Sequence, residues 1–482
     1  MASPVDLNEV YNHHLQLQQA IIKQLEALCP DGTKFVKVDV PTPEGVINTC
    51  YLLERTGECN DVTDPRFVPI ERAGVVVTLA KGRKMPSGVV PTPGTNVDVE
   101  IPPAGVTFDA AHISVMVHPR SPHAPICHDN RRTIVSYDPQ KSSSDWWFGG
   151  ASNLTPSLLY KEDAVDWHQG IKDNTSEFGV DSYHPMKKWC DEYFHNPHFK
   201  ETRGIGGIFF DNLSTKPHER LDIKGSDTQR PKSFEQCLEF SISTMTKLWS
   251  DTYVKILRDR GFTSWTAAER DHQLTERGRF IDHFLACDIG FRFGLQTKSG
   301  SLTAMRLILP PYAQWVHDPE FEPESEKAKA QMEVFKNPID WEQSGAGRIF
   351  FDGLSDKPHE KLDIHGEATK RPKSAQECLA FFKSTGESFL SAYMPILERR
   401  AMLPWTQEER NWQLIRRGPF VEFCLLVDEG VKFGIQTGSG SLDAILLILP
   451  ETAQWEYNTS KPSVGERGAR LLEILKQPKD WV

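Results

Sequence analysis

The segment 114–135, SVMVHPRSPHAPICHDNRRTIV, is the densest group of side chains that could do chemistry. Its last eight residues have the composition of a β-strand, in which alternate side chains share one face. His128, Asn130 and Arg132 would then present an imidazole, an amide and a guanidinium over about 13 Å, at roughly 3.3 Å per residue. This triplet suits an anionic ligand that accepts hydrogen bonds. A solvated edge strand would explain the same pattern equally well.

Two further segments offer ligand contacts. In DWWFGGASNLTPS (145–157), Trp146 and Trp147 precede two glycines, which is typical of a backbone that passes close to a flat group. Arg203 precedes the glycines of GIGG (204–207), but these come before a strand, whereas a dinucleotide-binding loop follows one. We therefore reject a dinucleotide or P-loop site and retain Arg203 as a candidate anion contact.

Four histidines raise the question of a metal: His118, His128, His168 and His198. They lack the short spacings of zinc sites, such as H-E-x-x-H or paired C-x-x-C motifs. Isolated histidines are more often buried or surface polar residues than ligands. We therefore expect no metal site, with these four as weak candidates.

The composition is that of an ordinary globular protein, with 482 residues, 39% hydrophobic and 25% charged, enough for two to four domains. A net charge of −11 argues against broad binding to nucleic acid or anionic membranes. The nine cysteines form no C-x-x-C pair, no stretch resembles a secretory or transit peptide, and no apolar run is long enough to span a membrane. These features predict a cytoplasmic protein with reduced thiols.

A tandem repeat organises the chain. IFFDNLSTKPHERLDIKGSDTQRPKS (208–233) returns as IFFDGLSDKPHEKLDIHGEATKRPKS (349–374), an offset of 141, and FGLQTKSGSL (293–302) returns as FGIQTGSGSL (433–442), an offset of 140. The period is far longer than that of a solenoid repeat. One large unit has therefore been duplicated.

The coarse pattern of elements predicts an α+β fold, with a large sheet flanked by helices. We expect helices at 6–28, 233–261, 268–278 and 325–337, and strands at 46–53, 73–80, 111–118, 128–135 and 206–213. The aromatic and β-branched run 280–297 predicts strands joined by a hairpin, and 302–311 predicts another strand. The Pro- and Gly-rich stretch 84–105 predicts a surface loop.

Several motifs, in order, resemble those of the oxygen-dependent coproporphyrinogen III oxidases: WWFGG with LTP, HPRSPHAP with HDNRR, KKWCDEYF, RGIGGIFFD and the closing KDWV. In this resemblance, residues 1–342 form one unit of family length, and 347–482 form a second, partial copy of its C-terminal half, about 208–342. The resemblance implies a large antiparallel sheet flanked by helices on both faces. It also implies a dimer.

The resemblance further implies an enzyme that uses molecular oxygen as co-substrate and has no compulsory organic or metal cofactor. The family oxidatively decarboxylates two propionates of a tetrapyrrole to vinyl groups, giving protoporphyrinogen IX in haem biosynthesis. By motif, His128 matches a proposed proton-transfer histidine and Arg203 an active-site arginine. The family's substrate contacts correspond here to Ser114, Asn130 and Arg132. The histidines suggested to hold a metal in the family correspond to His118, His168 and His198.

Three departures from the family pattern concern the substrate. Asn153 stands at a position that is normally an aspartate expected to accept hydrogen bonds from pyrrole N–H groups; an amide offers one acceptor and two donors. Ile289 and Ser301 stand where the family has arginines. Coproporphyrinogen carries four carboxylates, so losing two cations removes charge-assisted bonds of roughly 1.5 to 3 kcal/mol each.

These departures favour an O₂-dependent oxidase or oxidative decarboxylase retuned to a small anionic or aromatic substrate other than coproporphyrinogen III, in a specialised metabolic pathway. His128 and Asn153 would occupy the catalytic positions, and Trp146 and Trp147 would form a wall against a flat ligand. The alternatives are an authentic coproporphyrinogen III oxidase and a non-catalytic binding protein on the same fold.

The second copy lacks any counterpart of residues 1–203, so it cannot form a second active site. It would pack where the partner of a homodimer packs, giving an intramolecular pseudo-dimer. A homodimer of full chains is the other possibility. The two copies would also arise if alternative exons were joined in one transcript.

Overall fold

In this computed structural model the described residues are 5–55, 59–85, 105–138, 144–178, 182–196, 201–222, 230–297, 302–315, 354–357, 371–428, 430–431 and 447–456. The chain divides into two compact units, one of residues 1–341 with 414–459 and one of residues 342–413 with 460–482. The division passes through the second copy of the repeat, because residues 414–459 pack with the first copy. The exposed helix α9 (Ala375–Ala401) lies entirely in the second unit.

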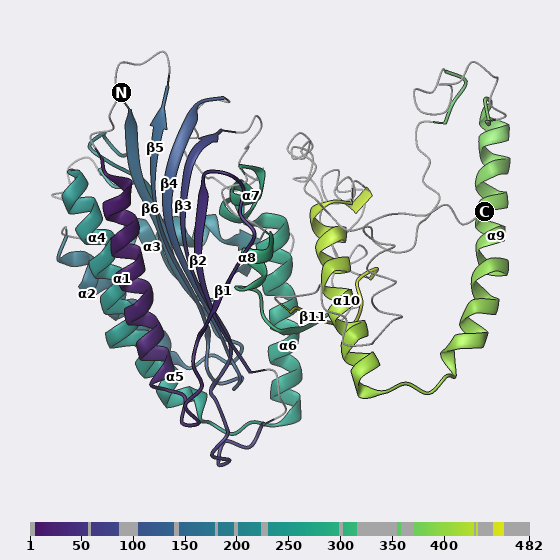
Figure 1. The fold of residues 1–482 in the computed structure, drawn as a ribbon, viewed down its shortest axis with the longest axis horizontal. Coiled ribbons are helices and arrows are strands. Elements are labelled where there is room, and N and C mark those ends of the chain that lie inside the picture. Colours follow the sequence, from purple (N-terminus) through teal and green to yellow (C-terminus); the bar gives the residue numbers. More distant parts are fainter. Residues whose placement is uncertain are drawn as a thin grey trace. The chain divides into compact units, whose positions relative to one another are not determined.

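The first unit is built on a seven-stranded sheet in which all neighbouring strands are antiparallel (Figure 1). In spatial order its strands are β1 (Val36–Val38), β2 (Val46–Glu54), β3 (Ile70–Lys84), β4 (Thr107–Pro119), β5 (Ile126–Tyr137), β6 (Asp145–Thr155) and β9 (Gly206–Leu213). Short strands β7 (His195–Asn196) and β8 (Glu201–Thr202) form a separate pair. The predicted strands at 46–53, 73–80, 111–118, 128–135 and 206–213 are all present.

Helices cover one face of the sheet through a continuous apolar core. This layer consists of α1 (Leu7–Glu26), α2 (Lys161–Ser176), α4 (Phe234–Lys247), the π-helical segment η1 (Leu248–Tyr253) and α5 (Val254–Gly261). Ser233 begins α4 as predicted, because its side chain accepts the N–H of Gln236 in a capping box. Val75 and Val77 of β3 point into this core, and the intervening Val76 points to the opposite face.

The opposite face is covered by α6 (Ala267–Asp282), the π-helical segment η2 (His283–Cys287), α7 (Ile289–Gln296) and α8 (Leu302–Arg306), as Figure 1 shows. Helix α3 (Tyr183–Tyr193) packs against β9. Two segments of the second copy complete this layer. One is helix α10 (Gln407–Leu426), which belongs to the first unit from residue 414 on. The other is strand β11 (Thr452–Gln454), which pairs with β10 (Tyr312–Gln314). The α+β class, with helices on both faces of an antiparallel sheet, is confirmed.

Two sequence predictions were wrong. Residues 280–297 are not a hairpin but the end of α6, η2 and α7, and residues 302–311 contain the short helix α8 rather than a strand. The apolar residues of 280–297 recur at helical spacing, with Phe280, Phe284 and Phe291 buried in one cluster. Asp288, taken as a hairpin residue, begins α7 by accepting the N–H of Phe291.

Two other predictions fall largely outside the described residues, namely the helix at 325–337 and the loop at 84–105. Among the helices of the described residues, none combines the length and apolarity needed to cross a bilayer.

Candidate active site

A cavity of about 230 Å³ lies between the sheet and the helices that cover its second face. Strands β4 and β5 supply its polar side, with His112, Ser114, His128, Asn130 and Arg132. The helical side is apolar and is supplied by Ile289, Phe291, Phe293, Ala304, Met305 and Ile308. The cavity therefore combines an apolar wall with a small set of convergent polar groups, as small-molecule sites commonly do.

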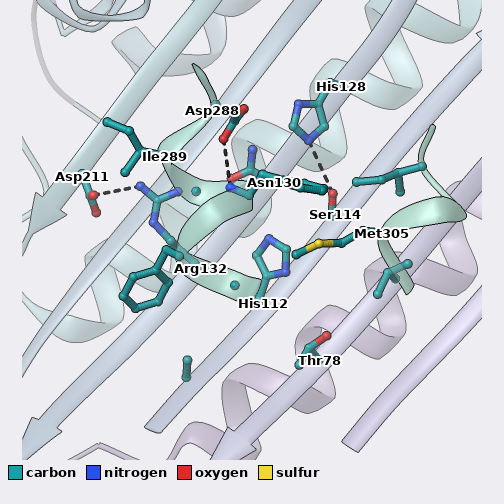
Figure 2. A pocket seen from close by; sticks show the side chains of 18 of the residues that line it. Thr78, His112, Ser114, His128, Asn130, Arg132, Asp211, Asp288, Ile289 and Met305 are labelled. Atoms are coloured by element: carbon teal, nitrogen blue, oxygen red, sulfur yellow. Dashed lines mark hydrogen bonds and ion pairs between the residues drawn. The ribbon is translucent and has the colours of Figure 1, made fainter. Parts of the chain in front are cut away.

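Alternation along β5 places the predicted triplet on one face. His128, Asn130 and Arg132 all line the cavity, whereas Asp129 and Arg131 form a buried ion pair on the other face. The register of β4 with β5 adds neighbours on the same face, because Ser114 lies opposite Asn130 and His112 opposite Arg132. Figure 2 shows these side chains together on this face, with His128 directed toward Ser114 and Arg132 directed toward Asp211.

The hydrogen bonds of His128 determine which of its nitrogens carries the proton. Nη2 of Arg203 lies 3.2 Å from Nδ1 of His128. A guanidinium can only donate, so Nδ1 must accept, and the neutral ring then carries its proton on Nε2. Nε2 lies 3.5 Å from Oγ of Ser114 on the cavity side (Figure 2). The imidazole is thus arranged to donate a hydrogen bond into the cavity.

Both histidines of the cavity are held neutral. Burial lowers the pKa of His128 well below 6.5, and the nearby Arg203, His112 and His118 lower it further. Burial, with help from Arg132, lowers the pKa of His112 to about 4. At neutral pH these rings therefore contribute hydrogen bonds to the site and no positive charge.

Arg203 lies behind His128 and is neutralised there. Its side chain is 1% exposed, and its Nη1 donates to Oδ2 of Asp288 over 3.0 Å. Its Nη2 also donates to Oδ1 of Asn153 over 2.9 Å. The ring of Phe194 lies 4.0 Å from the guanidinium carbon. Arg203 is not among the residues that line the cavity, so the predicted anion contact is a buried residue that positions His128.

Asn153 is likewise buried and does not line the cavity. Its Nδ2 donates to Sγ of Cys190 over 3.5 Å, while its Oδ1 accepts from Arg203. Both ends of the amide are thus engaged within the protein. Asn153 is thus linked to the cavity through Arg203, which contacts His128.

The two tryptophans of β6 are separated by strand alternation. Trp147 lines the cavity, whereas Trp146 packs against the opposite apolar core, with its ring edge-on to those of Phe148 and Phe234. A flat ligand would therefore meet one indole.

Arg132 is the guanidinium that lines the cavity, and it is already paired. Its Nη2 donates to Oδ2 of Asp211 over 2.8 Å (Figure 2), and its side chain is 21% exposed. Of the described residues around the cavity, Arg132 is the one permanent cation, while Asp211 and Asp288 are anions. This part of the wall therefore carries no excess positive charge.

The histidines considered for a metal have separate partners. Nε2 of His118 bonds the backbone oxygen of Ile308, and His168 bonds Tyr183 and the backbone oxygen of Ile205. His198 and Ser301 lie outside the described residues. No group of three or more metal-ligating side chains occurs within the part of the chain that the structure describes.

Sequence reasoning missed His112 and did not assign Asp211 or Asp288 to the site. His112 could have been found, because it is two residues before Ser114 on the same strand and therefore shares its face. Asp211 and Asp288 lie on different elements, and nothing in the sequence indicates that they neutralise Arg132 and Arg203.

The amino-acid sequence matches the family model described as coproporphyrinogen III oxidase over residues 9–341 and again over residues 342–481. The two matched segments meet where the second copy of the repeat begins, and together they cover nearly the whole chain.

Proposed function

Because the chain belongs to the coproporphyrinogen III oxidase family, we propose that it is an O₂-dependent oxidase whose substrate carries fewer carboxylates than coproporphyrinogen III. The substrate would be a flat or largely apolar molecule with at most one or two acidic groups. A reaction of this kind suits a specialised metabolic pathway.

The charge balance of the described wall carries this proposal. Four carboxylates would need several cations, since each charge-assisted bond to a guanidinium contributes about 1.5 to 3 kcal/mol. Arg132 is shared with Asp211, and Arg203 is buried against Asp288. Ile289, at a position where the family has arginine, adds an apolar side chain to the cavity.

Three residues of the cavity wall have a role in this proposal. Nε2–H of His128 donates to the substrate, with its orientation fixed by Arg203. Arg132 contacts a single acidic group, and Trp147 packs against a flat face. Because Nδ1 of His128 is engaged by a cation, this histidine acts as a hydrogen-bond donor and not as a strong base at neutral pH.

Authentic coproporphyrinogen III oxidase activity is the second candidate. The family match over residues 9–341 favours it, together with the intact group of His128, Asn130 and Arg132 on one wall.

An aerobic assay distinguishes these functions. The protein is incubated with coproporphyrinogen III, while O₂ uptake and vinyl products are followed for the natural chain and for Asn153→Asp. We expect no turnover by the natural chain, and turnover by the variant would show that retuning is reversible at this position. Turnover by the natural chain at the rate of an ordinary oxidase would support the second candidate. Tight binding without O₂ uptake on any porphyrinogen would support a non-catalytic binding protein.

A further inference from the structure

The second copy contacts the first through equivalent strands. β10 pairs antiparallel with β11, and Ala313 lies opposite Ala453. In this part of the repeat the two copies are offset by 140, so Ala453 is the counterpart of Ala313. Each strand therefore pairs with its own counterpart.

The flanking hydrogen bonds are reciprocal. The backbone N–H of Trp315 donates to the oxygen of Glu451 over 2.9 Å, and that of Trp455 donates to the oxygen of Pro311 over 3.0 Å. Exchanging the two copies turns one bond into the other. Such reciprocity defines a two-fold contact between two copies of one surface.

The helices behind these strands also correspond. Gly278 of α6 and Gly418 of α10 are counterparts, and each allows its helix to approach its own strand closely. A Cβ at Gly278 would lie 2.3 Å from the oxygen of Gln314, and one at Gly418 would lie 2.6 Å from that of Gln454. Residues of both helices share one buried apolar cluster, including Ile281 and Val421.

An ion pair connects this contact to the cavity. Arg306, the last residue of α8, donates from Nε to Oε1 of Glu422 over 3.0 Å and from Nη2 to Oε2 over 2.7 Å. Glu422 belongs to α10 and is fully buried. Ala304 and Met305 of α8 line the cavity. The second copy therefore holds the element that forms part of the cavity wall.

The contact departs from symmetry at this ion pair. The counterparts of Glu422 and Arg306 are Asp282 and Leu446, and leucine cannot return the bond. Asp282 is buried, its Oδ1 accepts from Nε1 of Trp315, and its Oδ2 has no hydrogen-bond partner within the described residues. The two copies have thus diverged so that one side supplies the carboxylate and the other the guanidinium.

We infer that the second copy is a built-in partner subunit, which occupies the face that an identical chain would otherwise cover and braces the cavity wall through Glu422 and Arg306. The second copy lacks counterparts of residues 1–203, which in the first copy carry strands β1–β6. The protein would then be a single-chain assembly, whichever substrate the cavity binds.

Cysteine cross-linking of the full chain tests the arrangement. In the double variant Ala313→Cys, Ala453→Cys, oxidation is expected to form a disulfide within one chain, found by peptide mass spectrometry at the mass of a single chain. Ala313→Cys alone should not link two chains, because residue 313 lies opposite Ala453 of its own chain, which has no thiol. The oxidised natural chain is the background control. A doubled mass for either variant, or no disulfide in the double variant, would overturn the inference.

Hydrogen exchange tests the bracing of the cavity wall. Glu422→Gln keeps the shape of the side chain but removes its charge, and we expect exchange in 302–309 to become about tenfold faster, as for a local opening. Exchange in β3–β5 should not change. Glu408→Gln, at an exposed position of the same helix, is the matched control. Unchanged exchange in 302–309, or equal acceleration across the sheet, would contradict the bracing role.

Discussion

Arg203 donates a hydrogen bond from Nη2 to Nδ1 of His128 over 3.2 Å. Both side chains are buried, and of the two only His128 lines the cavity. This one contact fixes the tautomer of the imidazole and, with burial, keeps the ring neutral. Asn153 and Asp288 hold Arg203 in turn. The tautomer that His128 presents to the cavity is therefore set by Arg203, which does not itself line the cavity.

Asn153→Asp should make His128 easier to protonate. An added carboxylate beside Arg203 offsets part of the positive charge that faces the imidazole, and we expect the pKa of His128 to rise. Titration of labelled histidine by NMR measures the change. Asn8→Asp, an exposed substitution on α1, should leave His128 unaffected. A pKa that stays fixed or falls in Asn153→Asp would contradict the proposed coupling.

Asp211→Asn should free Arg132 for an anionic ligand. Losing the partner carboxylate leaves the guanidinium available, so the affinity for coproporphyrin III should rise about tenfold, equivalent to about 1.4 kcal/mol. Fluorescence titration measures the affinity. The gain should disappear when Arg132→Gln is added. If the gain persists in that double variant, Arg132 is not the group released.

Asp282 should make stability depend on pH. Burial raises its pKa from 3.8 to about 7, so between these values the unfolded chain loses a proton that the folded chain keeps. Stability contributed by this group therefore falls as pH rises from about 4 to 7, by at most about 1.4 kcal/mol per pH unit, and is constant above that. Thermal unfolding at several pH values should show that Asp282→Asn loses less stability with rising pH than the natural chain does.

The exposed Asp271→Asn on the same helix is the control for this measurement. If Asp282→Asn and the natural chain lose stability equally between pH 5 and pH 8, the carboxyl of Asp282 is already ionised in the folded protein.

Glu71→Gln should destabilise the attachment of α6 to the sheet. The carboxylate of Glu71 is 2% exposed and pairs with Arg270 and Arg277 at 2.6 and 2.7 Å. Removing its charge leaves the fully buried Arg277 without its partner, at an expected cost of about 3 to 5 kcal/mol in the free energy of unfolding. Denaturant unfolding measures this cost, and the exposed Glu44→Gln should change it by less than about 0.5 kcal/mol. Equal midpoints for the two variants would refute the prediction.

The sequence predicted the strands that carry the polar side of the site. Strand alternation alone placed His128, Asn130 and Arg132 on one face, because a buried strand has a side-chain period of two. The same rule, applied to DWWFGG, would have separated Trp146 from Trp147 and assigned only one of them to the cavity.

The helical wall could not be predicted in the same way. Aromatic and β-branched residues made 280–297 resemble strands, although their spacing also fits one face of a helix, and packing against the sheet decides between the two. The burial of Asn153 behind Arg203 depends on a contact between residues 50 positions apart, which no local pattern shows.

The most direct test of the central claim is the affinity of the cavity for three porphyrins that share one ring and differ in acidic groups: coproporphyrin III with four carboxylates, mesoporphyrin IX with two, and etioporphyrin III with none. Arg132, the guanidinium among the described residues of the cavity wall, is already paired with Asp211. The cavity should therefore bind the porphyrin with two carboxylates, or the one with none, at least about tenfold more tightly than coproporphyrin III. Tightest binding of coproporphyrin III would contradict the account and would indicate a site built for a four-acid ring.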